Sequence, residues 1–465
     1  MADAVAASTD LLGGVRRLHL VGVAGAGMSA LAKLTFQSGL EVSGSDLRGG
    51  IELAALADLG VNTWAGHHPE LLEGVELVVA SSAIPDNDPE LVAAAGRGIE
   101  VWRRPRLLQE LTRSLNTIGP TGTHGKTTTS ALMVMGLRAT GIDPSFVIGG
   151  DLQDLGTNAH LGSDPPLVLE ADEAFGTFEL LNLRGLVVTN VEPEHLDYFE
   201  TADQMENTFV DVARRVIGPV VCCLDDPGSL RVAQRTGAVT YGLDDGADWH
   251  LTDLDECGHK VSFLLRVPDG PVIEVEVPRP GRHVALNAAG ALVLLGELGH
   301  DLEKAARGLA TFAGVKRRFE LRGHVGGVTL IDDYAHHPTE VAAVIRAARS
   351  GSYRRIWAVF QPHLFSRTKL LYREFGVALA AADRVVVTDV YAAREEPIPG
   401  VTGDLIADAA RRAGAQVLYV SHRGDIAGAI APELGAGDLV LSMGAGDITL
   451  LPGEVAALLS SRGSR

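Results

Sequence analysis

Short apolar runs alternate with amphipathic stretches along most of the chain, and this alternation limits the possible fold more than any other feature. Runs of strand length separated by segments of helical spacing are typical of βαβ units, in which crossover helices join parallel strands. We therefore predict an α/β protein built on parallel sheets. At 465 residues the chain is long enough for several such domains.

The predicted strands fall into three sets, which divide the chain into domains at residues 1–113, 114–316 and 317–465. Strands are expected at 17–23, 41–45, 61–64, 76–80, 100–102, 117–118, 167–170, 186–190, 220–225, 328–333, 356–360, 384–389, 416–420 and 439–443. Helices are expected at 28–38, 127–140, 202–216, 285–297, 302–312, 339–349 and 369–381. Alternating apolar residues with turns predict a small antiparallel insert at 249–278 in the second domain.

A glycine-rich loop, Gly122-Thr-His-Gly125-Lys126-Thr-Thr, follows a predicted strand and opens a predicted helix. In that context backbone N–H groups wrap the phosphates of a nucleotide, a lysine adds a point charge, and a hydroxyl ligates Mg²⁺. The strict pattern has a glycine where this chain has Pro120, and an ordinary turn is the alternative. The sequence favours ATP binding by Gly122, Thr123, His124, Gly125, Lys126, Thr127 and Thr128.

Acidic residues end another strand of the predicted central sheet, in Glu170-Ala-Asp172-Glu173. Carboxylates in a row are costly to bury unless they hold a cation, and Mg²⁺ prefers carboxylate, hydroxyl and water oxygens. A solvated acidic turn is the alternative interpretation. His195 lies at the end of the following strand, where a histidine can ligate a second metal ion or orient a phosphate.

Three loops of the first predicted sheet carry residues that suit a nucleotide-type ligand. The loop Gly22-Val-Ala-Gly25-Ala-Gly27 leads into a helix whose N-terminus favours negative charge, and Asp46 ends the next strand. His67 and Ser82-Ala83 follow the next two strands. Ligands of open α/β sheets bind beyond the carboxyl ends of strands, so these loops should converge. The glycine order departs from the dinucleotide fingerprint, which leaves a tight packing turn as the alternative.

A polar cluster follows the first strand of the third set, in Asp332-Asp-Tyr334-Ala-His336-His-Pro. His363 and Arg367 follow the next strand, and an arginine can hold a carboxylate through two parallel hydrogen bonds. Glu395-Glu396 and Gly444-Ala-Gly446-Asp447 complete the same predicted rim. Polar residues at strand–helix junctions indicate a binding site, and plain loop surface is the alternative.

The net charge argues against one class of partner. The chain carries 40 lysines and arginines against 59 aspartates and glutamates, a net charge of −19. Because binding to a nucleic-acid backbone needs basic surface, we expect no nucleic-acid partner. The 3 cysteines cannot build a disulfide framework, and no apolar stretch approaches the ~20 residues of a membrane span. We expect a cytoplasmic protein with no signal peptide and no membrane insertion.

Taken in order, these motifs resemble those of the Mur ligase family, and the resemblance covers nearly the whole chain. The run Asp332-Asp-Tyr-Ala-His-His-Pro-Thr-Glu340 is the most discriminating. The other matching segments are 19–29, 42–46, 82–85, 122–128, 170–173, 189–192, 281–283, 316–319, 360–363 and 444–448.

The resemblance implies a Rossmann-like first domain for a UDP-sugar, a central ATPase domain, and a Rossmann-like last domain for an amino acid. It implies a ligase of peptidoglycan synthesis, in which ATP phosphorylates the lactyl carboxylate of UDP-N-acetylmuramate. The amine of L-alanine then attacks the acyl phosphate, and ADP and phosphate are released. The implied metal is Mg²⁺, with Mn²⁺ as the alternative. We expect a monomer or a weak homodimer.

The resemblance also assigns residues to each role. The matched catalytic positions are Lys126, Glu170, His195, Arg318 and Asp333. The matched metal ligands are Thr127, Glu170 and His195. Besides the phosphate loop, the matched ATP contacts are Asn287, Arg318 and Asp333. The matched UDP-sugar contacts are Gly25, Ala26, Gly27, Met28, Asp46, His67, Ser82 and Ala83. The matched amino-acid contacts are Tyr334, His336 and Arg367.

This chain departs from the family pattern at four points. Ala24, Val284 and Leu364 stand where many members have a glycine, an asparagine and an arginine, respectively. No lysine occurs between Lys126 and Lys260, so we predict no counterpart of the carbamylated lysine of sister ligases.

Three rival functions stay open on the sequence alone. The nearest is a related ligase that adds a recycled peptide to the same sugar nucleotide. The second is a nicotinamide-dependent oxidoreductase built on the first glycine loop, against which the phosphate loop and the acids at 170–173 argue. The third is a nucleotide-binding regulator without catalysis.

Overall fold

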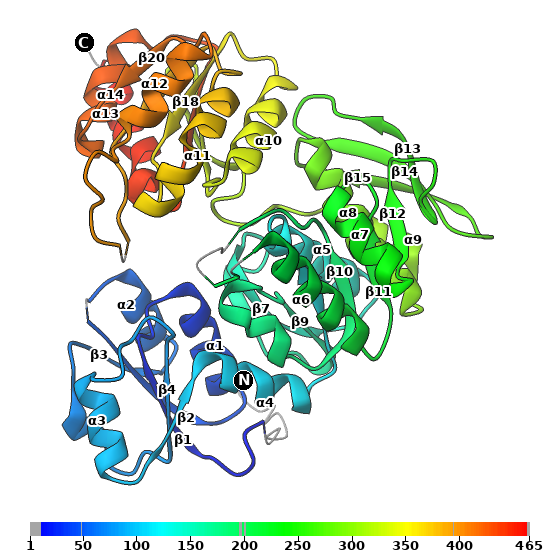
Figure 1. Cartoon of the computed structure of the whole chain (residues 1–465), viewed down its shortest axis with the longest axis vertical. Helices are drawn as coiled ribbons and strands as arrows, with labels where there is room; N and C mark the ends of the chain where they lie inside the picture. Colours follow the sequence, from blue (N-terminus) through cyan, green and yellow to red (C-terminus); the bar gives the residue numbers. More distant parts are fainter. Residues whose placement is uncertain (1–10, 48, 195–197, 200, 394, 463–465) are drawn as a thin grey trace. The chain divides into compact units, whose positions relative to one another are not determined.

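The computed structural model describes residues 11–47, 49–194, 198–199, 201–393 and 395–462. Within these ranges the strands form sheets of five, ten and six strands, which confirms the predicted α/β class (Figure 1). The chain packs into two compact units. The first runs to Thr252 and includes Leu264–Val275 and Leu286–Phe312, and the second comprises Asp253–Phe263, Glu276–Ala285 and the chain from Ala313 onward. The three-domain division stays a prediction.

The first sheet has the strand order β3-β2-β1-β4-β5, and each neighbouring pair is parallel. Its strands are β1 (Arg17–Val21), β2 (Glu41–Asp46), β3 (Asn62–Ala65), β4 (Leu77–Ala80) and β5 (Glu100–Arg103). Its helices are α1 (Ala26–Gln37), α2 (Ile51–Asp58), α3 (Pro89–Gly96) and α4 (Arg104–Ser114). The strand order reverses between β1 and β4, and ligands of such sheets bind at that switch point.

The second sheet has the order β15-β14-β13-β12-β11-β10-β6-β9-β7-β8, with β6 parallel to both β9 and β10. Its strands are β6 (Thr117–Thr121), β7 (Pro144–Leu152), β8 (Thr157–His160), β9 (Asp164–Leu169), β10 (Leu183–Val188), β11 (Val220–Cys223), β12 (Val239–Gly242), β13 (Trp249–Asp255), β14 (Val261–Arg266) and β15 (Val272–Val277). Its helices are α5 (Lys126–Ala139), η2 (Ala174–Leu180), α6 (Ala202–Arg215), α7 (Pro227–Thr236), α8 (Arg282–Glu297) and α9 (Leu302–Leu309).

The third sheet has the order β16-β17-β21-β18-β19-β20, and only the β16–β17 pair is antiparallel. Its strands are β16 (Glu320–Val325), β17 (Val328–Asp333), β18 (Arg355–Phe360), β19 (Arg384–Val387), β20 (Val417–Tyr419) and β21 (Asp438–Met443). Its helices are α10 (Pro338–Arg349), α11 (Phe365–Leu379), α12 (Asp404–Arg412), α13 (Ile426–Ile430) and α14 (Leu451–Arg462).

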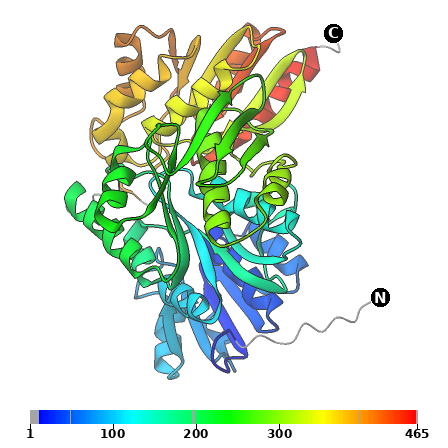
Figure 2. The same cartoon turned by 90° about the vertical axis from the view of Figure 1, so that its right-hand side faces the viewer.

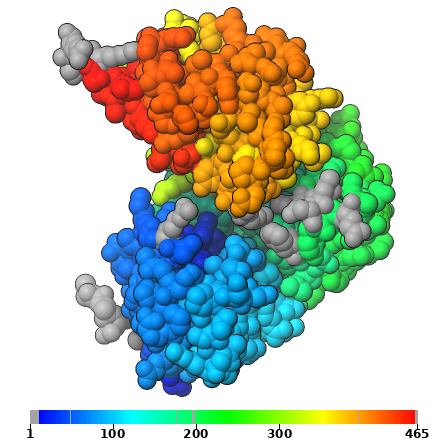
Figure 3. Space-filling model, turned by 60° about the vertical axis from the view of Figure 1, so that its left-hand side comes forward, coloured from blue at the N-terminus to red at the C-terminus, as the bar shows by residue number. Residues whose placement is uncertain are grey.

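Both faces of the third sheet are covered by helices (Figures 1 and 2). Along β17, Ile331 packs into one apolar core and Leu330 into the other, as alternation along a strand requires. On one face, α11 and α12 approach so closely that a Cβ at Gly376 would lie 2.5 Å from that of Ala409. Figure 3 shows residues 365–412, which include α11 and α12, in yellow and orange. Among the described helices, none has the length and apolar character needed to cross a membrane.

One apolar core joins the first and second sheets within the first unit. Leu31 and Leu34 of α1 share this core with Val147 of β7 and Ala159 of β8. The Lys33 ammonium also bonds the Asn158 amide oxygen at 2.7 Å. The sequence did not predict β7 and β8, because Pro144 and a glycine pair at 149–150 interrupt the apolar pattern of β7.

The tight approach of β6 to β9 generates a stability prediction. A Cβ at Gly119 would lie 1.7 Å from the carbonyl oxygen of Leu169. We expect Gly119→Ala to lower the free energy of unfolding by ~3 kcal/mol or more, because the strands must separate to admit the methyl group. Gly96→Ala, at the end of α3, meets no atom within 4 Å and should change stability by ~1 kcal/mol at most. Urea unfolding followed by circular dichroism checks both, and equal midpoints for the two variants would contradict the packing argument.

Candidate nucleotide and amino-acid site

The phosphate loop lies between β6 and α5, where only glycine fits at two positions. Gly122 has φ +129°, and a Cβ there would lie 2.3 Å from the Thr189 hydroxyl oxygen. Gly125 has φ +85°, and a Cβ there would lie 2.5 Å from Asn287 Oδ1. The loop therefore keeps its backbone N–H groups close to the N-terminus of α5, which is the arrangement that binds phosphate groups.

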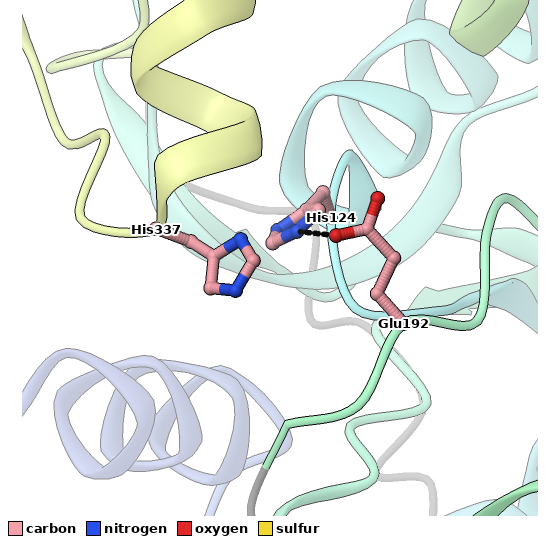
Figure 4. A group of neighbouring side chains, drawn as sticks. All are labelled: His124, Glu192 and His337. Atoms are coloured by element: carbon pink, nitrogen blue, oxygen red, sulfur yellow. Dashed lines mark ion pairs between the residues drawn. The ribbon is translucent and has the colours of Figure 1, made fainter. Parts of the chain in front are cut away.

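The segment after β10 holds the loop from its other side. The Asn190 side chain accepts the His124 N–H at 2.8 Å and donates to its carbonyl oxygen at 3.0 Å. Thr123 Oγ1 accepts the Glu192 N–H at 2.9 Å. The His124 ring faces the Glu192 carboxylate, with Nε2 and Oε2 3.5 Å apart (Figure 4). These contacts tie the loop to the next strand of the same sheet before any ligand binds.

Lys126, the first residue of α5, is largely buried against acidic side chains. Its Nζ lies 2.8 Å and 2.9 Å from the two oxygens of Glu173 and 3.7 Å from Asp172 Oδ1. It also donates to the Gly122 carbonyl oxygen at 2.6 Å. Burial alone would lower the pKa of Lys126, but the two carboxylates outweigh it and raise that pKa. Lys126 is therefore charged at every physiological pH.

Glu170 and Thr127 form an oxygen-rich corner beside the loop. A Cβ at Gly149 would lie 3.1 Å from Glu170 Oε1 and 3.2 Å from Thr127 Oγ1, so this corner is shaped around a glycine. The Gly149 N–H donates to Glu170 at 2.6 Å. Burial raises the pKa of Glu170 despite that bond and the nearby Lys126. A carboxylate and a hydroxyl side by side fit the oxygen ligands that Mg²⁺ prefers.

The other predicted residues of the central region lie at different places. Asn287, in α8, is buried against Gly125 of the loop. Thr128 follows Thr127 in the first turn of α5. His195, predicted as a metal ligand and catalytic residue, lies outside the described residues.

A cavity of about 390 Å³ lies at the carboxyl ends of the first sheet's strands. Gly22, Asp46, His67 and Ala83 line it, so three of the loops named from the sequence meet there. The ring of His67 pairs with Asp88, with Nδ1 and Oδ2 3.1 Å apart. The other predicted UDP-sugar residues are not among its lining residues: Gly25, Ala26, Gly27, Met28 and Ser82.

The wall of this cavity contains a buried polar network. Glu90 is fully buried and accepts hydrogen bonds from the Ser45 hydroxyl and the His68 N–H, while His19 Nε2 lies 3.7 Å away. Burial would raise the pKa of Glu90, but His19, Ser45 and the His68 N–H together lower it. Asp88 caps α3 by accepting the Glu90 N–H at 2.9 Å. The network thus fixes the loops rather than leaving a carboxylate exposed.

In the second unit, Asp333 ends β17 and organises the preceding turn. Its carboxylate accepts the N–H groups of Phe319 and Ala335, each at 2.7 Å. Burial raises the pKa of Asp333 to about 6, although Arg318 and the two N–H groups oppose it. The guanidinium carbon of Arg318 lies 5.2 Å from the centre of the Tyr334 ring, a cation–π contact.

The residues predicted for the amino acid come together in the same unit. Tyr334 and His336 pack edge to face with ring centres 5.1 Å apart, and His336 lies 6.0 Å from His363. His363 Nδ1 is 3.3 Å from Nη1 of Arg367 and its ring stacks on Tyr391 at 6.0 Å. An arginine beside aromatic rings can hold a carboxylate while the rings limit the space around it.

Sequence reasoning missed the contacts that hold these groups in place. The Arg317 guanidinium donates to the carbonyl oxygens of Gly444 and Gly446 at 2.6 and 3.2 Å. The pairing of Lys126 with Glu173 was also not predicted. The conformation of Arg317, whose φ is +60°, gives no signal in the sequence. The acidic run at 170–173 was a signal for Glu173, but it did not show which carboxylate reaches the lysine.

The three residues that depart from the family pattern, Ala24, Val284 and Leu364, all lie in the described part of the structure. The Ala24 N–H donates to Asp46 Oδ2 at 3.1 Å, so this turn forms without the glycine. Val284 is buried in the first turn of α8. Leu364 precedes α11 with φ +71°, a backbone conformation that residues other than glycine rarely adopt.

The fold and the site together define a nucleotide-dependent α/β enzyme with a phosphate loop. Three family models match the chain: "Mur ligase family, catalytic domain" at residues 17–115, "Mur ligase middle domain" at 121–295, and "Mur ligase, glutamate ligase domain" at 317–446. The chain belongs to the Mur ligase family, as its motifs predicted.

Similar proteins extend over nearly the whole chain. UDP-N-acetylmuramate–L-alanine ligase of Mycolicibacterium gilvum is 43% identical, covering 96% of this chain and 97% of that protein. The protein of the same name from Thermobifida fusca is 42% identical, covering 95% and 96%. The crystal structure of UDP-N-acetylmuramate-alanine ligase from Thermotoga maritima is 27% identical with a TM-score of 0.83, covering 97% and 100%. A murein peptide ligase structure from Psychrobacter arcticus is 25% identical with a TM-score of 0.71, covering 97% and 99%.

The environment of His283 generates a prediction on pH. Burial lowers the pKa of His283 to about 4, and Arg346 acts in the same direction while Glu340 opposes it. In the unfolded chain a histidine takes up a proton near pH 6.5, whereas folded His283 stays neutral down to about pH 4. The unfolded state therefore binds more protons in this window, and stability falls as the pH drops. We expect His283→Gln to lose less stability than the parent protein between pH 6.5 and 4.

Urea unfolding at several pH values measures this difference. The raised pKa of Asp333 has the opposite effect, but it is present in both proteins and cancels in the comparison. Parallel stability curves for parent and variant would show that His283 does not have the depressed pKa.

Proposed function

We propose that this chain is a UDP-N-acetylmuramate–L-alanine ligase, which uses ATP to join L-alanine to the lactyl carboxylate of UDP-N-acetylmuramate. Full-length similarity to enzymes of that name, at 42–43% identity, is the observation that carries the proposal. The phosphate loop with its largely buried lysine supports the use of ATP. The cavity of the first sheet and the cluster around Tyr334 support a sugar nucleotide and an amino acid as the other two substrates.

The proposed reaction has two steps. A carboxylate is a poor electrophile, so an oxygen of the lactyl carboxylate first attacks the γ-phosphorus of ATP and ADP leaves. The amine of alanine then attacks the acyl carbon, the amide bond forms, and inorganic phosphate leaves. Lys126 and the loop N–H groups offset the charge that spreads over the transferred phosphoryl group.

The remaining roles combine the described positions with what the resemblance to the family implies. Glu170 and Thr127 would hold Mg²⁺, or Mn²⁺ in its place, and the ion would neutralise phosphate charge. His195 is proposed as a ligand of a second ion. Arg318 and Asp333 are proposed to act on the nucleotide, and Arg367 would hold the carboxylate of alanine. We further propose a cytoplasmic enzyme of three domains, monomeric or weakly dimeric, with no nucleic-acid partner.

The nearest rival is a ligase that adds a peptide to the same sugar nucleotide; the Psychrobacter arcticus structure is named a murein peptide ligase. The higher TM-score of the alanine ligase structure, 0.83 against 0.71, favours alanine. One extra methylene is discriminated by only ~1–3 kcal/mol, so a small pocket need not exclude every larger amino acid.

Coupled ADP release tests the function directly. We expect sustained release over many turnovers only when ATP, Mg²⁺, UDP-N-acetylmuramate and L-alanine are all present, because without alanine the acyl phosphate is not consumed and each site forms at most one ADP. L-alanyl-γ-D-glutamyl-meso-diaminopimelate in place of alanine should support little turnover. Faster release with that tripeptide would identify the peptide ligase instead. ATP turnover without either acceptor, or none under any condition, would contradict a ligase.

Arg367→Ala tests the amino-acid site. Loss of a charged hydrogen-bond donor costs ~1.5–3 kcal/mol, so we expect the KM for alanine to rise ~10–100-fold. The KM for ATP should change by less than ~3-fold. Arg373→Ala is the matched control, because Arg373 lies on the same helix, is exposed, and bonds only the Tyr372 hydroxyl among the side chains described. Equal effects of Arg367→Ala on both KM values would contradict the assignment.

A further inference from the structure

Lys126 has no hydrogen-bond donor to spare for a phosphate in this structure. An ammonium group has three N–H donors. The Gly122 carbonyl oxygen lies 2.6 Å from Nζ, and the two oxygens of Glu173 lie 2.9 and 2.8 Å away. The Thr123 carbonyl oxygen, 3.4 Å away, is a fourth acceptor. A triphosphate that enters the loop must therefore replace at least one of these contacts.

Of the three groups that bond Lys126 among the described residues, two are backbone carbonyl oxygens, those of Gly122 and Thr123, and only the Glu173 carboxylate can withdraw by side-chain rotation. The Gly122 carbonyl belongs to a backbone that is confined by Thr189 and Asn190, whose atoms lie 2.3 and 2.6 Å from the position of an added Cβ. Glu173 is a side chain at the start of η2, and its carboxylate can move by rotation about its own bonds. The carboxylate is 1% exposed, so Lys126 shields a buried negative charge.

We propose that Glu173 is a positioning residue that takes the place of a phosphate beside Lys126, and that a bound nucleotide displaces its carboxylate from Nζ. The inference rests on the proposed function, because it takes a nucleoside triphosphate as the ligand of the loop. While Glu173 is paired with Lys126, the loop is not fully competent to bind phosphate. The apparent affinity for nucleotide is reduced in proportion to the fraction of molecules in that state.

Glu173→Gln separates this role from a purely structural one. Glutamine keeps the size of the side chain and one acceptor oxygen, but it removes the negative charge that competes with phosphate. We expect the Kd for the β,γ-imido analogue of ATP with Mg²⁺ to fall ~3–10-fold in the full-length protein, measured by calorimetry. The nucleotide-free variant should melt at a lower temperature, because Lys126 loses its counter-ion. Damage to the fold alone would lower both stability and affinity.

Asp172→Asn is the matched control. Asp172 carries the same charge one residue away, but it lies 3.7 Å from Nζ and is one-third exposed. We expect its removal to change the Kd by less than ~2-fold, because solvent screens it and it occupies no donor of Lys126.

The outcomes separate this inference from the proposed function. A parent protein that does not bind the analogue at all refutes ATP use itself. A parent that binds, with an unchanged or higher Kd in folded Glu173→Gln, shows that Glu173 and phosphate do not compete. If Glu173→Gln does not fold, Glu173→Asp serves instead, because the shorter carboxylate reaches Nζ less closely. Its Kd should also fall, by a smaller factor, and an unchanged or higher value overturns the proposal.

Discussion

The Lys126 ammonium, whose side chain is only 14% exposed, must be held inside a chain whose net charge is −19. The protein does this with two carboxylates that raise the lysine's pKa and with loop carbonyl oxygens that fix its Nζ. Glycines at 122 and 125 let Thr189 and Asn287 approach the loop, so its backbone donors are set before a ligand arrives. An acidic protein can thus bind a polyanion, because a few preorganised donors act where water is excluded.

The parallel sheets explain how residues distant in sequence reach common sites. β6 lies between β9 and β10, so the phosphate loop, the acidic run at 170–173 and the segment after Val188 meet at one edge. The same rule brings Asp46 and His67 to one cavity in the first sheet. In the third sheet β21 separates β17 from β18, and the polar run after β17 still reaches the loop after β18, where the His336 and His363 ring centres lie 6.0 Å apart. The order of strands in the sheets, rather than closeness along the chain, therefore brings these polar side chains together.

The sequence predicted the elements whose periodicity is strong and whose ends carry polar residues. The predicted strand at 328–333 is β17 to the residue, and α5 begins one residue before its predicted start. It missed β7 and β8, where proline and glycine hide the pattern. The sequence indicated which loops form the sites, but not the residues that hold those loops in place. Examples are Arg317, with its positive φ, and Glu173, whose carboxylate bonds Lys126 Nζ. Those contacts depend on side-chain rotamers and tertiary packing, which spacing along the chain does not encode.

The account depends on one chemical claim, that ATP activates a carboxylate by phosphorylating it. Oxygen transfer tests this most directly, with UDP-N-acetylmuramate whose lactyl carboxylate carries ¹⁸O at both oxygens. When the amide forms, the acyl carbon keeps one carboxylate oxygen and the other leaves with phosphate. The account predicts that mass spectrometry finds one ¹⁸O atom in the inorganic phosphate for each amide bond made. Phosphate free of ¹⁸O, together with normal amide formation, would contradict it.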